Sequence, residues 1–251
     1  MTDDEFDLFG DLDPEEQIQA TTRQKSMHHD NNIRLKRLQQ DPPEKRTIAT
    51  NRWIYSQVFR QPSLHPCVLP HLLSPEECDK ILSQLPTFTD EWTMDRHSVF
   101  PTTDIPIAST PSLHYLTNLL QHRLVEPILA PTYGFAPGQL GFRDLFLVCY
   151  DSSAQNGLAP HTDGCLLSFN VLINSPDGFD GGGTLFFLPS DDLTIRPNHQ
   201  GDAVYHDAHI RHQGLDITRG QRIVLVGFVD TVDTLEKDRI AQQLPKRRME
   251  Y

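Results

Sequence analysis

Hydrophobic residues first recur at helical spacing, over roughly the second quarter of the chain. Ser74 precedes Pro75, and Glu77 stands three positions after the serine, which is the sequence signature of a capped helix start. A second helix is predicted from Thr110, and Pro127 is expected to bend it or end it. The apolar positions of the two predicted helices are Ile81, Leu82, Leu85, Leu113, Leu116, Leu120 and Leu124.

After Gly134 the spacing changes to short apolar runs, which are separated by Gly, Pro, Asn and Asp. Runs of this length and composition predict β-strands. Helices followed by a succession of short strands indicate an α+β fold with a double-stranded β-helix (jelly roll) core and flanking N-terminal helices. The predicted strands are residues 145–150, 166–173, 184–188, 203–205 and 223–229.

Composition divides the chain into three parts. Residues 1–50 begin with an acidic stretch and hold few apolar side chains, so a disordered acidic and polar extension is expected there. Residues 51–235 are the expected folded domain, with its strand-rich part at about 140–230. Residues 236–251 are an expected C-terminal tail, whose basic residues 245–248 are either a nuclear import signal or a plain basic end.

Charge and cysteine content limit the binding partners and the cellular compartments that the sequence favours. The 251 residues carry a formal net charge of −12, which argues against nucleic acid and anionic membranes as partners. The chain has no apolar stretch of membrane-spanning length and no signal peptide at its start. Its four cysteines are scattered, as reduced thiols usually are. We therefore expect a cytoplasmic or nuclear protein that is not secreted.

Candidate metal ligands begin with His161 and Asp163, which follow a predicted strand. Side chains two positions apart in an extended segment point to the same side, so both could reach one metal ion. The pattern alone is weak, because His28 and Asp30 repeat it within the extension expected to be disordered. Without further support, a surface or core histidine is the better interpretation of His161.

The third ligand comes from a cluster of His206, His209 and His212. His212 is favoured because a strand with Arg222 follows it. Two histidines and one carboxylate hold ferrous iron and leave its opposite face open. The alternative is a structural zinc site made of the three clustered histidines, but no cysteine, which such sites prefer, lies nearby.

Arg222 belongs to a strand face that is otherwise apolar, with Val224, Val226 and Phe228. Burying an arginine on such a face is costly unless it meets an anion, and a carboxylate matches the guanidinium in two hydrogen bonds. The strand therefore predicts a carboxylate-containing ligand, with an ordinary salt bridge as the alternative.

Further motifs accompany these residues in a fixed order. The motifs are, in order, Cys149-Tyr150, His161-x-Asp163, Phe179-Asp180-Gly181-Gly182-Gly183-Thr184, Gly201-Asp202, His212-x-Gly214 and Gly220-x-Arg222. With this order of motifs, residues 67–230 resemble the 2-oxoglutarate and iron dioxygenases of the prolyl 4-hydroxylase type.

The resemblance implies that His161, Asp163 and His212 bind Fe(II), that Arg222 pairs with the distal carboxylate of 2-oxoglutarate, and that Tyr150 lines the cosubstrate pocket. The chain departs from some members of the family, because it has no obvious tyrosine on the strand after His161. Asn170 on that strand either faces the pocket or has a structural role. The short spacing from His212 to Arg222 argues against the nucleic-acid demethylase relatives, and Asp163 favours hydroxylation over halogenation.

The resemblance thus implies an Fe(II)- and 2-oxoglutarate-dependent dioxygenase, an oxidoreductase that consumes O2 and releases succinate and CO2. The substrate is a protein, in the manner of prolyl hydroxylases, or a small molecule, and L-ascorbate keeps the iron reduced. Collagen is disfavoured because the chain lacks a secretory signal. The rival hypothesis is a catalytically inactive jelly-roll binding module that retains the motif.

Overall fold

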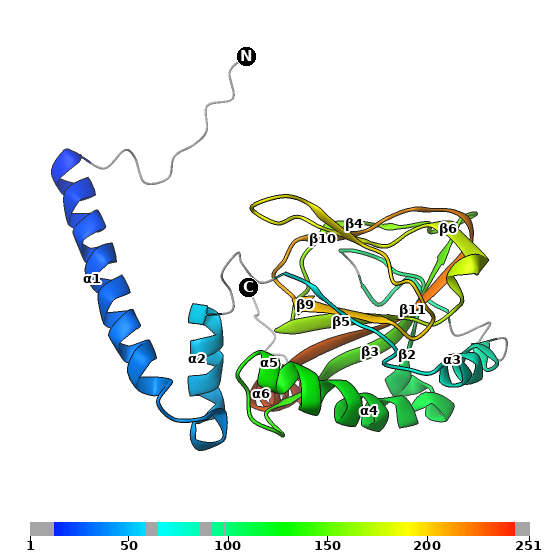
Figure 1. Ribbon diagram of the computed structural model, residues 1–251, viewed down its shortest axis with the longest axis horizontal. Helices are drawn as coiled ribbons and strands as arrows, with labels where there is room; N and C mark the ends of the chain where they lie inside the picture. The colour runs from blue at the N-terminus through cyan, green and yellow to red at the C-terminus, as the bar shows by residue number, and fades with distance from the viewer. Residues whose placement is uncertain (1–12, 59–64, 86–91, 98, 244–251) are drawn as a thin grey trace, which may run out of the picture.

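The computed structural model describes residues 13–58, 65–85, 92–97 and 99–243. Two antiparallel sheets face each other, and helices cover the outer side of the larger one (Figure 1). The larger sheet consists of β1 (Cys67–Leu69), β2 (Asp104–Pro106), β3 (Leu140–Asp151), β5 (Leu167–Leu172), β6 (Phe179–Gly181), β9 (Ala203–Asp207) and β11 (Ile217–Thr231). The smaller sheet consists of β4 (Leu158–His161), β7 (Thr184–Phe186), β8 (Leu193–Ile195) and β10 (His212–Gly214).

The strand order is that of a double-stranded β-helix. The larger sheet runs β1-β9-β5-β11-β3-β2, with β6 paired to β11, and the smaller runs β4-β10-β7-β8. Most neighbours in each sheet are distant in sequence, so the chain passes repeatedly from one sheet to the other. The predicted α+β fold with a jelly-roll core is confirmed. Every predicted strand is present, although β11 starts six residues earlier than predicted.

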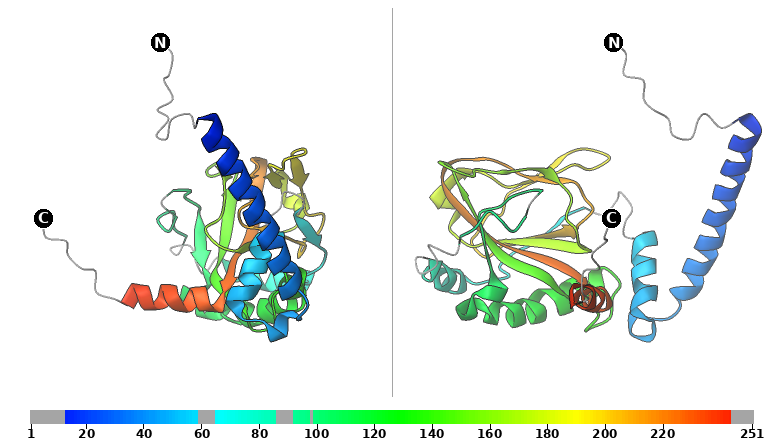
Figure 2. Two further views of the ribbon diagram at one scale, coloured as in Figure 1. Left: turned by 90° about the vertical axis from the view of Figure 1, so that its left-hand side faces the viewer. Right: turned by 180° about the vertical axis from the view of Figure 1, so that it is seen from behind.

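The helical elements mostly lie on one side of the larger sheet, but the N-terminal helices and the short turn before β6 do not (Figures 1 and 2). They are α1 (Pro14–Leu38), the 3₁₀ turn η1 (Pro43–Lys45), α2 (Ile48–Val58), α3 (Pro75–Leu82), the 3₁₀ turns η3 (Ile107–Ser109), η4 (Pro111–Leu113) and η6 (Pro176–Gly178), α4 (Tyr115–Leu120), the π-helix η5 (Gln121–Leu129), α5 (Ala130–Thr132) and α6 (Val232–Gln243). Ser74 caps α3 with Glu77 in the reciprocal box that the sequence predicts.

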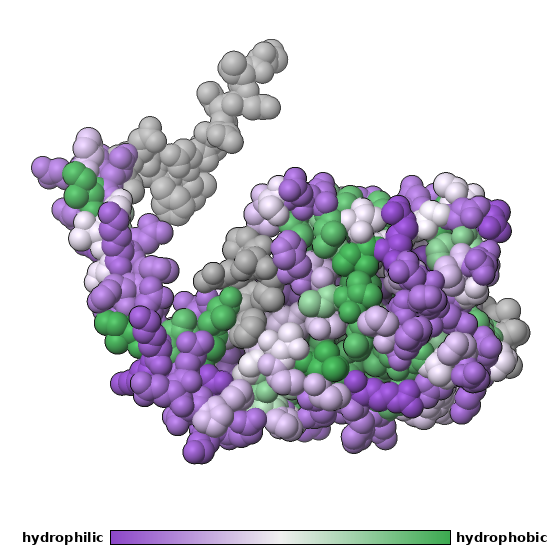
Figure 3. Space-filling view, viewed as in Figure 1, coloured by the Kyte–Doolittle hydropathy of each residue, from purple (hydrophilic) through white to green (hydrophobic). Residues whose placement is uncertain are grey.

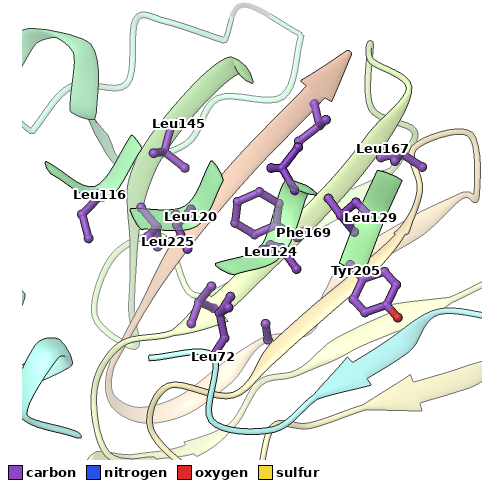
Figure 4. Packing of buried hydrophobic residues seen from close by; sticks show 14 of the residues in the cluster. Leu72, Leu116, Leu120, Leu124, Leu129, Leu145, Leu167, Phe169, Tyr205 and Leu225 are labelled. Atoms are coloured by element: carbon purple, nitrogen blue, oxygen red, sulfur yellow. The ribbon is translucent and has the colours of Figure 1, made fainter. Parts of the chain in front are cut away.

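The main core lies between the larger sheet and the helices α4, η5 and α5 (Figure 4). Of the leucines predicted at helical spacing, Leu116, Leu120 and Leu124 are buried in one cluster with Phe169 of β5 and Leu225 of β11. Leu82 and Leu85 are partly buried against the same cluster. Pro127 does not end the helix, because the wider π-helical turns of η5 accommodate a residue that lacks an N–H group. This packing fixes the back of the larger sheet and leaves its front face for the site.

The N-terminal segment departs from the sequence-based expectation. Residues 1–50 were expected to be unfolded, yet from residue 13 the structure has α1, η1 and the first turn of α2. Helix α1 begins at a complete capping box between Asp13 and Glu16, with acidic residues in its first turn and basic residues in its last. These local effects favour a helix without burial, and none of its residues is buried.

Figures 1 and 2 show α1 extending away from the sheets, with α2 as its neighbour. Its surface is mostly hydrophilic (Figure 3). The proposed domain boundary near residue 51 therefore stays a prediction. At the other end, α6 occupies residues 236–243 of the expected tail, and the basic residues 245–248 lie outside the described residues, as do residues 1–12. None of the described helices combines the length and the apolar character that crossing a bilayer requires.

Deleting residues 1–40 should lower the free energy of unfolding by about 1 kcal/mol at most. The guanidinium of Arg34 lies 4.4 Å from the ring centroid of Trp53, and an exposed contact of this kind contributes about 0.5–1 kcal/mol. Urea denaturation would measure the change. Deleting residues 1–47 should cost more, because the buried Asn51 then loses its hydrogen bond to the carbonyl of Pro43. Equal losses in the two truncations would contradict this account.

Candidate metal centre

His161 and His212 lie side by side because β4 pairs with β10 in a register that sets the two residues opposite each other. Their ring centroids are 4.4 Å apart. The Nδ1 atom of His161 lies 2.8 Å from the carbonyl oxygen of Ala159, and that of His212 lies 2.9 Å from the carbonyl oxygen of Ile210. Because a carbonyl only accepts, each Nδ1 carries the proton, and each Nε2 keeps its lone pair for a metal ion.

Asp163 completes the cluster. Its Oδ1 lies 3.4 Å from Nε2 of His161, and its Oδ2 lies 3.6 Å from Nε2 of His212. Its backbone N–H donates to the carbonyl of Ala208 at 2.9 Å, which fixes the chain after β4. The structure thus brings together the three residues that the sequence predicts, with one ligand atom of each lying within 4.8 Å of the others.

The electrostatics of the cluster suit a metal ion. Burial lowers the pKa of His212 to about 4. Burial would raise the pKa of Asp163, but its contact with His161 and the attraction of His212 and His206, whose rings are positively charged once protonated, outweigh burial and bring that pKa to about 2. At neutral pH His212 is therefore neutral and Asp163 is ionised, which are the forms that coordinate a metal.

Arg222 lies on β11 directly opposite Tyr150 of β3. Its side chain is buried, and its guanidinium carbon is 5.5 Å from the centroid of the Tyr150 ring. Burial lowers its pKa. Among the described residues no carboxylate pairs with Arg222, so its buried charge lacks the anion that normally compensates for lost hydration. The ordinary salt bridge that the sequence left open is therefore not seen within the described part of the chain.

Two glycines leave room for these side chains. A Cβ atom at Gly182 would lie 3.1 Å from Cδ of Arg222, and the backbone φ of +68° at this residue also favours glycine. A Cβ atom at Gly214 would lie 3.1 Å from the hydroxyl of Tyr150. Gly182 of the glycine-rich turn and Gly214 thus leave the space that Arg222 and Tyr150 require.

The three candidate metal ligands, Arg222 and Tyr150 all line one cavity of about 360 Å³ between the two sheets. Its lining includes every second residue of β11 from Arg222 to Phe228, which is the strand face that the sequence predicts. Asn170 lines the cavity as well, and its buried Oδ1 atom has no hydrogen-bond partner among the described residues. Asn170 therefore faces the pocket, which is the first of the two alternatives that the sequence allowed.

Aromatic side chains also line the cavity. They include Phe146 and Phe228 together with His97, whose ring centroid lies 5.1 Å from that of Phe146. Phe100 lies against His161, with 5.0 Å between the ring centroids. His97 and Phe100 lie in an irregular segment that shows no periodic pattern in the sequence.

The other candidate histidines do not form a metal site. His206 is buried and lines the cavity, but its Nδ1 lies 2.9 Å from the carbonyl oxygen of Asp207. His209 is half exposed and lies against the carboxylate of Asp207. Among the described residues these two do not converge with His212 into a three-ligand group, so the zinc alternative is not supported. His28 and its neighbours lie exposed on α1.

Comparison with known proteins gives a consistent result. No protein-family model matches the chain. Procollagen-lysine,2-oxoglutarate 5-dioxygenase 1 of Rattus norvegicus is 32% identical over 113 residues, which are 43% of this chain and 15% of that protein. A PKHD-type hydroxylase of Maricaulis maris is 34% identical over 87 residues, 31% of this chain and 39% of that protein. The chain thus spans well under half the length of these curated relatives.

Among solved structures, a prolyl hydroxylase from Trichoplax adhaerens, in complex with a peptide fragment of the hypoxia inducible factor oxygen degradation domain, superimposes with a TM-score of 0.52. It is 12% identical, and the match covers 78% of this chain and 94% of that one. The likeness shows the fold. The chain is thus similar in sequence, over part of its length, to a curated 2-oxoglutarate dioxygenase and a curated hydroxylase, and similar in fold to a solved prolyl hydroxylase.

Replacing His161, Asp163 or His212 with alanine should weaken Fe(II) binding at least about tenfold, because even the outer-shell partners of metal ligands contribute that much. Anaerobic titration of the purified protein with Fe(II) would measure the affinity. His28→Ala and His209→Ala should bind iron as the unaltered protein does. Normal binding by His212→Ala together with lost binding by His209→Ala would show that the third ligand was wrongly assigned.

Proposed function

We propose that the chain is an Fe(II)- and 2-oxoglutarate-dependent dioxygenase that hydroxylates its substrate and releases succinate and CO2. The observation that carries this proposal is the buried Arg222, which has no carboxylate partner among the described residues and shares one cavity with His161, Asp163 and His212. A metal centre and a buried cation at two places in one cavity suit a ligand that chelates the metal and ends in a carboxylate. Such a ligand is 2-oxoglutarate.

The donor set fits ferrous iron. Two imidazole nitrogens with available lone pairs and one ionised carboxylate are the ligands of non-haem Fe(II) oxygenases. His161, Asp163 and His212 would hold the ion, and their arrangement leaves its remaining positions to small molecules. When bound, the iron supplies the activation of O2 for oxidation of the cosubstrate and the substrate.

The remaining polar groups would hold the cosubstrate. Arg222 would bind its distal carboxylate through two hydrogen bonds, and burial would make this contact strong because little water competes for it. Tyr150 lines the same cavity. The unpartnered carbonyl oxygen of Asn170 leaves the amide of this residue able to orient a polar ligand. The apolar strand face around Val224 excludes water from the bound molecule.

The substrate would enter near His97 and Phe100, which line the cavity together with Phe146 and Phe228. The names of the similar proteins point to protein side chains, since they include a procollagen-lysine dioxygenase and a prolyl hydroxylase with a bound peptide. For this chain we infer hydroxylation of a protein, of prolyl type, or of a small molecule, with L-ascorbate keeping the iron reduced. The four cysteines are free thiols, which supports a reducing compartment such as the cytoplasm or nucleus.

Incubating the protein with Fe(II), 2-oxoglutarate and O2 should release succinate, and His212→Ala should release none, because it lacks a metal ligand. Succinate would be measured by mass spectrometry over time, with ascorbate present and absent. Protein that binds both iron and 2-oxoglutarate without releasing succinate, with every candidate substrate supplied, would instead be the inactive binding module.

Arg222→Ala should weaken the binding of 2-oxoglutarate while leaving Fe(II) bound, because Arg222 is not a metal ligand. Losing one buried charge-assisted contact costs about 2–5 kcal/mol, which is on the order of a thirtyfold to several-thousandfold weakening. Arg222→Lys should restore part of the affinity, since lysine keeps the charge without the planar fork. Calorimetric titration measures the effect, and an unchanged affinity for 2-oxoglutarate in Arg222→Ala would refute the assignment.

A further inference from the structure

A second cluster of two histidines and one aspartate lies away from the cavity. His71 stands in the loop between β1 and α3, and His199 and Asp202 stand in the turn before β9. The loop and the turn meet because β1 pairs with β9, and the N–H of Leu73 donates to the carbonyl of Gly201 at 3.2 Å. None of the three clustered side chains lines the cavity of the candidate metal centre.

The geometry of this cluster resembles that of a metal site before the ion binds. Nδ1 of His71 lies 3.8 Å from Oδ1 of Asp202, and Nδ1 of His199 lies 3.4 Å from Oδ2. One ligand atom of each residue lies within 4.8 Å of the others. Tetrahedral zinc with bonds of about 2.0–2.1 Å separates neighbouring ligand atoms by roughly 3.3 Å. Small side-chain rotations would therefore bring all three groups onto one ion.

Asp202 is a fixed ligand in this cluster. Its side chain is 4% exposed. Its Oδ1 accepts the backbone N–H of His71 at 2.9 Å, and its Oδ2 accepts that of His199 at 3.0 Å. An ionised carboxylate has about four acceptor sites, so each oxygen keeps one for an ion. The carboxylate is thus held in place before any ion binds.

The two imidazoles are accessible. The side chains of His71 and His199 are 66% and 64% exposed, and their ring centroids are 5.3 Å apart. If Nε2 of each ring carries the proton, it donates to water and leaves Nδ1 with its lone pair. His71 also has a left-handed backbone with φ of +54°, a conformation that is uncommon for residues other than glycine and persists where surrounding contacts hold it.

We propose that His71, His199 and Asp202 form a second metal site, which takes a divalent transition-metal ion such as Zn²⁺. Imidazole donors exclude Ca²⁺ and Mg²⁺, which prefer oxygen ligands. The same donors bind Zn²⁺ more tightly than Fe²⁺ in the usual order of affinities. With three protein ligands the ion keeps a position for water, as the exposure of the site allows.

The bound ion would cross-link the loop before α3 to the turn before β9. These two segments flank the edge strand β1, which is three residues long and pairs with β9 alone in the larger sheet. An ion that binds only the folded chain stabilises it by mass action. The site therefore acts as a zinc-dependent clamp on this edge of the fold, separate from the iron centre.

The test uses the full chain carrying His212→Ala, so that the candidate iron centre contributes as little as possible to Zn²⁺ binding. Titration with Zn²⁺ against a chromophoric chelator should show one site per chain. Adding His71→Ala or His199→Ala should weaken that affinity at least about tenfold. Adding His209→Ala is the matched control, because His209 also lies against a carboxylate but belongs to no three-ligand group among the described residues.

Thermal unfolding supplies a second measurement. Saturating Zn²⁺ should raise the melting temperature of His212→Ala, and this increase should vanish when His71→Ala is added. The single variant His71→Ala should release succinate as the unaltered protein does, because it leaves the cavity intact. Zn²⁺ affinity that is the same with and without His71→Ala and His199→Ala, or no Zn²⁺ binding by His212→Ala, would overturn the proposal.

Discussion

The antiparallel pairing of β4 with β10 is the contact on which the candidate metal centre depends. It sets His161 opposite His212 although the two are far apart in the chain. Strands this short add little stability on their own, so the positions of β4 and β10 are fixed by the rest of the smaller sheet, where β10 also pairs with β7. The two carbonyl groups that accept from the histidine rings belong to the same backbone segments. One local pairing thus determines the separation, the orientation and the tautomer of both imidazoles.

The buried guanidinium of Arg222 imposes a second constraint, which is energetic. An arginine without an anion in a cavity destabilises the fold, so the strands around it must supply the compensation. They do so through the long pairing of β11 with β3 on one side and with β5 on the other. Asn170 adds an unpartnered oxygen to the same cavity. Both groups are costly in the empty site and favourable once a polar ligand binds, as expected when a site is organised for its ligand before binding.

Most long elements could be predicted from the sequence, whereas most short ones could not. The long apolar runs of β3, β5 and β11 were recognisable, and so was the capped start of α3. Strands of three or four residues, such as β1, β4 and β10, carry too few positions to show a period of two. Helix α1 was missed because its stability comes from capping and not from an apolar face. His161, Asp163, His212 and Arg222 were found through their order in the chain, whereas His71 and Asp202 meet only through the β1–β9 pairing.

The two clusters of two histidines and one aspartate show that the ligand set alone does not define a metal site's role. In the cavity the rings are nearly buried, Nδ1 is engaged by the backbone, and Nε2 faces a space lined by further polar groups. At the β1–β9 edge the rings are mostly exposed, and Nδ1 is the atom nearest the carboxylate. A metal ion in the cavity could bind a further ligand at a place shielded from water, and oxidation chemistry requires such shielding. An ion at the exposed edge would keep contact with water, and its effect would be confined to joining two segments of the chain. Burial and hydrogen bonding around the ligands would therefore separate the proposed catalytic role from the proposed structural one.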